Sequence, residues 1–108
     1  MDAITKISQI TSESLAEYLR LYEVTADDTN TLNNMLGIAK AYISNYTGRS
    51  LAELDDYQDF VIVCFVLVQD MWDNRTLYVD QTNINFVVEG ILNNHSVNLL
   101  PTQEIENV

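Results

Sequence analysis

The chain has 108 residues, of which 16 are acidic and 5 are Lys or Arg, so its formal net charge at pH 7 is −11. This length suits one domain, and a hydrophobic content of 47% excludes a disordered chain. The charge disfavours a protein that grips nucleic acid, because such a grip needs clustered Lys and Arg. It fits either simple solubility or a surface that lies near DNA without binding it. With a single cysteine and no signal-peptide pattern, we expect a reducing compartment and no disulfide framework.

The N-terminal part predicts a lead-in and a short helix. Residues 1–10 carry isoleucines at every third position and suit a turn or short helix packed on a neighbour. Thr11 or Ser12 is a good cap for a helix that runs to about Tyr22. The apolar face of this helix would be formed by Leu15, Tyr18, Leu19 and Tyr22.

A second, longer helix is predicted from the capping pair Thr25 and Asp28 to about Thr47. Gly48 then suits the left-handed residue that follows a helix. Gly37 is unfavourable inside a helix, and we interpret it as the mark of a close helix crossing. One face carries apolar side chains at steps of three and four: Leu32, Met35, Leu36, Ala39, Tyr42, Ile43 and Tyr46.

The link from Arg49 to Leu54 contains a further Ser-x-x-Glu pair, Ser50 and Glu53, which predicts a short helical turn. Leu51 and Leu54 are expected to close the end of the core.

The stretch from Asp55 to Arg75 contains nine consecutive apolar residues, Phe60 to Val68. Its β-branched residues favour a strand, but about 20 residues without Gly or Pro are typical of a helix. Acidic residues at its start and Arg75 at its end also suit a helix dipole. Nine apolar residues rise only about 13 Å, too little to cross a membrane. We therefore predict the central helix of a bundle, buried all round in its middle.

After Arg75 the pattern weakens. Residues Thr76 to Asn83 fit an extended arm or one strand of a hairpin. A last helix is expected from Asn83 or Asn85 to the region Asn94–Ser96, with a buried stripe formed by Phe86, Val87, Ile91 and Leu92. The tail Val97–Val108 is expected to be flexible.

The fold class is therefore all-α. We predict one domain, residues 1–108, built as a small bundle of about four helices around the long helix 55–75, with an arm and a C-terminal tail.

The residues that usually carry chemistry are sparse, and we expect no enzyme, no cofactor and no metal. His95 is expected to be an exposed residue at a helix end, and Cys64 a small buried hydrophobe. The acidic cluster Asp55, Asp56 and Asp59 lacks the spacing of an EF-hand and is interpreted as a solvated helix start. Asp70 and Asp73 have Lys40 or Arg49 as candidate surface ion-pair partners.

The order of motifs resembles that of a known family. The segments ITSESLAEYLRL (10–21), Asp27-Asp28 and IAKAYISNYTGRSL (38–51) are followed by Leu54-Asp55-Asp56, then by Trp72, Asn74 and Arg75, and finally by Ile91-Leu92. This arrangement, covering about residues 10–100, resembles the small head–tail connector proteins of tailed bacteriophages.

The resemblance implies a structural subunit of the virion neck. Such proteins form a ring, commonly of twelve subunits, beneath the portal protein. They extend the channel for double-stranded DNA and present a platform for further neck and tail proteins. An acidic channel wall would then let DNA slide without sequence-specific binding. The alternative is a small acidic helical module that masks a basic partner protein.

Contacts with neighbours are expected outside the helical core, on the arm and the tail, because both carry apolar residues there. The candidate interface residues are Leu77, Tyr78, Val79, Leu99, Leu100 and Pro101.

Overall fold

The architecture is all-α, as predicted. A computed structural model describes residues 4–81 and 84–97, and within them no residue belongs to a strand. The arm is therefore not a hairpin strand in its described part; residues 76–81 form turns and irregular backbone. The elements in chain order are a 3-10 turn η1 (Ile7–Gln9) and the α-helices α1 (Ser12–Tyr18), α2 (Ala26–Thr47), α3 (Leu51–Leu54), α4 (Asp59–Asn74) and α5 (Phe86–His95).

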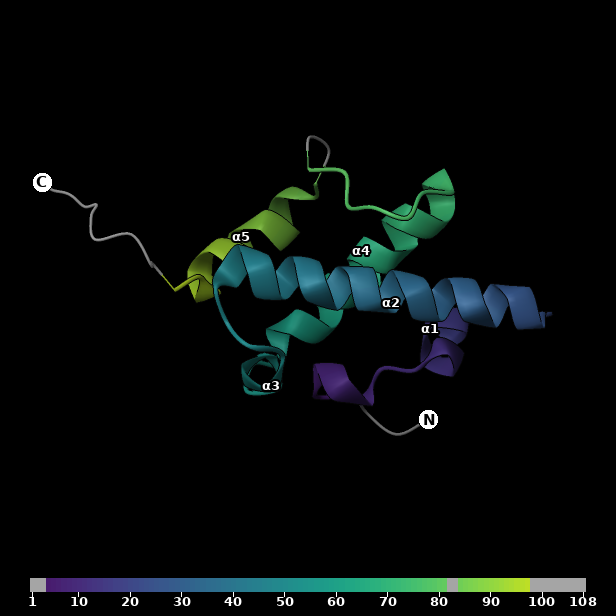
Figure 1. Cartoon of the computed structure of the whole chain (residues 1–108), viewed down its shortest axis with the longest axis horizontal. Coiled ribbons are helices and arrows are strands. Elements are labelled where there is room, and N and C mark those ends of the chain that lie inside the picture. Colours follow the sequence, from purple (N-terminus) through teal and green to yellow (C-terminus); the bar gives the residue numbers. More distant parts are fainter. Residues whose placement is uncertain (1–3, 82–83, 98–108) are drawn as a thin grey trace, which may run out of the picture.

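Helices α2 and α4 form the centre of the bundle. In Figure 1 α2 runs across the front of the molecule and α4 crosses behind it. The two share the most extensive helix contact, and α1 and α5 each pack against both. The four-residue α3 packs against α2, and η1 packs against α4.

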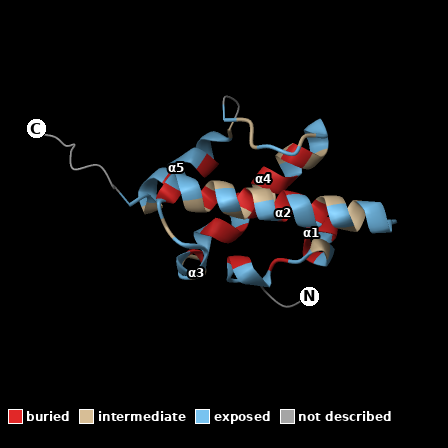
Figure 2. Ribbon diagram, in the orientation of Figure 1, coloured by how far each residue is buried: buried red, intermediate tan, exposed pale blue. Residues whose placement is uncertain are grey.

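The core lies where these helices face one another (Figure 2). The predicted stripe of α2 is confirmed at its centre, while Tyr42 is half-buried and Tyr46 is partly exposed. From the lead-in, Ile7 and Ile10 are buried in the core as expected. The side chains that α4 buries are Phe60, Val61, Val63, Cys64, Leu67, Val68 and Met71.

The helix starts follow the predicted capping chemistry. The Thr25 hydroxyl accepts the Asp28 N–H at 3.1 Å, and the Thr25 N–H donates to the Asp28 carboxylate at 3.2 Å. Ser50 and Glu53 make the same reciprocal pair at α3. Gly48 ends α2 with φ 74°, in the left-handed region that a side chain disfavours.

The central helix is shorter and less enclosed than predicted. It begins at Asp59 instead of Asp55, because residues 55–58 form the turns that reverse the chain after α3. Its middle is not buried all round: Ile62 is 48% exposed, and Phe65 and Val66 are half-buried. One side of α4 therefore remains uncovered.

Helix α1 also ends earlier than predicted, at Tyr18 instead of Tyr22. The Arg20 N–H donates to the Glu17 carbonyl at 3.1 Å and the Leu21 N–H to the Ala16 carbonyl at 2.9 Å. Arg20 itself has φ 60°. This is a Schellman ending with arginine in the place usually taken by glycine. Tyr22 is consequently 98% exposed and not part of a buried stripe.

Two smaller expectations are wrong. Leu54 closes the core, but Leu51 is exposed, because the single turn of α3 has only one inward side. Gly37 is exposed on α2, and a Cβ built there would meet no atom within 4 Å. It therefore does not mark a close helix crossing.

Candidate interaction surface

Backbone hydrogen bonds and a side-chain contact hold the start of the arm at the end of α4. Arg75 has φ 56°, its N–H donates to the Trp72 carbonyl, and the Thr76 N–H donates to the Met71 carbonyl at 3.0 Å. The Arg75 guanidinium lies 5.1 Å from the centre of the Trp72 ring. The chain then returns along the molecule to the start of α5 (Figure 1). A left-handed residue and a cation–π contact thus define where the arm begins.

The predicted interface residues of the arm separate into two kinds. Leu77 and Tyr78 are 55% and 61% exposed, as an interface requires. Val79 is half-buried and packs against the core, so it anchors the arm. Leu99, Leu100 and Pro101 lie outside the described residues.

The helical spacing predicted that Phe86 and Val87 are buried on α5, and this prediction is wrong. Phe86 is 86% exposed and Val87 is 66% exposed, whereas Val88 and Leu92 are buried. Asn85 fixes this orientation, since its side-chain oxygen accepts the N–H groups of Val87 at 2.8 Å and Val88 at 3.3 Å. A face made of Ile84, Val88, Ile91, Leu92 and His95 has equally good helical spacing and would have predicted the observed orientation.

We call the exposed apolar side chains Leu77, Tyr78, Phe86 and Val87 the arm surface. All four lie on the connection between α4 and α5 or on the first turn of α5. Exposed aromatic side chains are enriched in protein contacts, so these four residues are candidate contact residues.

A pocket of about 250 Å³ opens between the C-terminal half of α4 and the returning chain. Among its lining residues Leu67 is buried, whereas Gln69, Asp73 and Asn85 are exposed. Four lining residues are apolar and five are polar or acidic: Val66, Leu67, Val79 and Ile84, and Gln69, Asp70, Asp73, Asp80 and Asn85.

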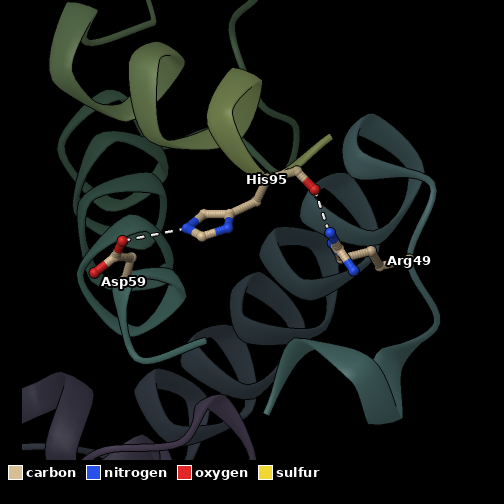
Figure 3. Close-up of polar contacts among 3 residues, drawn as sticks. All are labelled: Arg49, Asp59 and His95. Atoms are coloured by element: carbon tan, nitrogen blue, oxygen red, sulfur yellow. Dashed lines mark hydrogen bonds and ion pairs between the residues drawn. The ribbon is translucent and has the colours of Figure 1, made fainter. Parts of the chain in front are cut away.

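His95 is packed, not an exposed helix terminator. Its Nε2 lies 3.2 Å from Oδ2 of Asp59, and Arg49 Nε donates to the His95 carbonyl at 2.7 Å (Figure 3). The His95 ring is also centred 4.6 Å from the Tyr57 ring and 5.1 Å from that of Phe60. These contacts join the end of α5 to the start of α4 and to the link after α2.

The backbone after α5 is fixed by a further contact. The Val97 N–H donates to the Thr47 carbonyl at 2.7 Å, and the Tyr46 hydroxyl donates to Asn93 at 2.6 Å. The first of these bonds holds Val97 beside the end of α2.

Burial raises the pKa values of two ionisable side chains, Cys64 and Tyr42. Burial raises the pKa of the Cys64 thiol to about 12, so it is not a thiolate at neutral pH. The pKa of Tyr42 is raised, mainly by burial and further by the nearby Tyr46 and Glu89.

The acidic residues singled out in the sequence have other partners than expected. Asp55 accepts the Ser8 N–H at 2.9 Å. Hydrogen bonding to the Ser8 side chain, and then to this N–H, lowers the pKa of the Asp55 carboxyl. Asp70 accepts from the Asn74 amide at 3.1 Å; within the described ranges no ion pair joins Asp70 or Asp73 to Lys40 or Arg49. In the same ranges no group of three or more His, Cys, Asp or Glu residues is arranged to hold a metal ion.

Comparison with known proteins gives no significant match to a family model, a curated protein or a solved structure. No helix in the described part of the chain is long and apolar enough to span a bilayer.

Proposed function

We propose that this protein is a structural subunit of a bacteriophage head–tail connector, which assembles as a ring under the portal protein, extends the DNA channel and carries the tail. The observation that supports this proposal best is the arm surface. Leu77 and Tyr78 are exposed on the connection that begins at the left-handed Arg75, and Phe86 and Val87 are exposed on the first turn of α5, directly after the Asn85 cap. Covering such side chains by a neighbour would remove apolar area from water.

A ring built from identical subunits needs two different patches on each subunit. The arm surface supplies one. A second exposed apolar site lies at the connection between α1 and α2, where Tyr22 and Val24 are exposed. We assign these two sites to the two sides of a heterologous contact.

The charge and the motif order agree with this role. A net charge of −11 gives the channel wall the same sign as the DNA phosphates, which limits binding during passage. The resemblance to connector proteins covers the segments 10–21 and 38–51 and the later motifs around Trp72 and Ile91.

The test is to locate the chain in assembled particles by cryo-electron microscopy. We expect a ring between the portal and the tail, with the arm surface at a protein contact. Leu77→Ser combined with Tyr78→Ser should abolish incorporation without loss of helix content. Leu51→Ser, which changes an equally exposed leucine on α3, is the matched control and should still assemble.

Absence of the chain from the neck would refute the connector role. A small stoichiometric complex with a basic protein, in place of a ring on the portal, would favour the alternative of a masking module.

A further inference from the structure

The pocket between α4 and the returning chain is smaller than a typical small-molecule site. Its volume of about 250 Å³ lies below the range of roughly 300–1,000 Å³ that is typical of small-molecule sites. Leu67 is buried and Val66, Val79 and Ile84 are half-buried, so an occupant would enter between apolar walls.

Three Asp residues are among the residues that line this pocket. Asp70 and Asp73 come from the last turns of α4, and Asp80 comes from the arm. The negative end of the α4 dipole adds to their field. No Lys or Arg is among the lining residues, and Arg75, the basic residue next in sequence to Asp73, lies over the Trp72 ring.

The same carboxylates do not form a metal site. Within residues 4–81 and 84–97 no group of three or more His, Cys, Asp or Glu residues is arranged to hold a metal ion. An occupant that matches both the apolar walls and the carboxylates of the lining carries a positive charge at the end of an apolar stem. Among protein side chains, arginine combines an aliphatic stem with a planar head that has five N–H donors.

We propose that this pocket binds an arginine side chain of a partner protein. In the partner's sequence, aliphatic residues stand next to this arginine. The stem packs against Val66, Val79 and Ile84, and the guanidinium lies at the mouth near Asp73. This inference goes beyond the connector role, because it specifies the chemistry of a partner and does not require a ring.

The test uses the full chain in an NMR titration with two capped pentapeptides. One has a central arginine between two leucines; in the other, citrulline replaces arginine and keeps the shape without the charge. We expect the arginine peptide to shift the amide signals of Val66, Gln69, Val79 and Ile84, and the citrulline peptide to bind at least about threefold more weakly.

Asp73→Asn should lower the affinity for the arginine peptide by about three- to tenfold. Asp27→Asn is the matched control, since it removes one exposed charge in the first turn of α2, and it should leave binding unchanged. The proposal is overturned if the two peptides bind equally, if Asp27→Asn weakens binding as much as Asp73→Asn, or if the shifts spread over the whole acidic surface.

A second copy of this chain is the competing occupant, because Arg20 is exposed. Pocket signals that shift with protein concentration alone, and no longer do so in Arg20→Gln, would overturn the assignment to a different protein.

Discussion

Adjacent residues on α4 have opposite environments, and this difference can be tested directly. Val63 is fully buried between the helices, whereas Ile62 is exposed on the uncovered side. Both are β-branched residues in the same apolar run, so sequence pattern alone does not distinguish them. Only the packing of α1, α2 and α5 around α4 decides which one is enclosed.

Val63→Asp is expected to prevent folding. A carboxylate without a partner in the core costs several kcal/mol, a large part of the roughly 5–15 kcal/mol that stabilises a domain. Ile62→Asp should fold, with a stability loss of about 1 kcal/mol or less. Circular dichroism and thermal unfolding of the two variants measure the difference. If the Ile62 variant also fails to fold, the exposed side of α4 is wrongly assigned.

Asp55 links the lead-in to the turn before α4 and should make folding pH-dependent. The Ser8 side chain and the Ser8 N–H both hydrogen-bond its carboxylate, so its pKa is lower in the folded chain than in the unfolded one. The resulting stabilisation is complete above the unfolded pKa of about 3.9 and is lost as the pH falls towards the folded value.

Asp55→Asn should remove this dependence. We expect the stability difference between the parent chain and the variant to be constant above about pH 5 and to shrink at lower pH. Urea unfolding at several pH values measures it, and hydrogen exchange at Ser8 reports the local bond. A difference that grows as the pH falls would contradict the assigned role.

At the scale of elements, the ends of helices were predictable where their chemistry is local. Two capping boxes, at Thr25 and at Ser50, and the left-handed Gly48 involve only residues within four positions of one another. The sequence alone is therefore enough to predict these helix ends. The end of α1 was not predictable in this way, because Arg20 and not glycine adopts the left-handed conformation there. Likewise, the face that α5 buries depends on α2 and α4, which are distant in sequence.

The glycines of α2 provide the element-scale prediction. Gly37→Ala should stabilise the protein by up to about 1 kcal/mol, because the position is helical and a Cβ meets no neighbour. Gly48→Ala should destabilise it by about 1 kcal/mol, because φ is 74° there. Thermal unfolding of both variants gives the signs. A stability loss in Gly37→Ala would mean that the glycine serves a contact with another molecule.

At the scale of the whole molecule, the sequence was sufficient for the all-α class, the helix order and most of the core. It did not show which side of the bundle stays open. The exposed Ile62, Tyr22, Phe86 and Val87 all belong to apolar patterns that looked suitable for burial. An apolar residue on the surface follows the same sequence spacing as one buried in the core, so only the three-dimensional arrangement distinguishes the two.

The C-terminal residues allow a prediction about assembly that separates docking from folding. Removing residues 98–108 keeps the bond from the Val97 N–H to the Thr47 carbonyl, so we expect unchanged helix content and stability. On the proposed connector role, docking to the portal should nevertheless be lost, because the candidate interface residues Leu99, Leu100 and Pro101 are removed. Removing residues 97–108 should additionally cost about 1 kcal/mol of stability through the lost hydrogen bond. Thermal unfolding and co-sedimentation with portal rings measure the two effects, and a 1–97 chain that still binds the portal would show that the tail is not the docking segment.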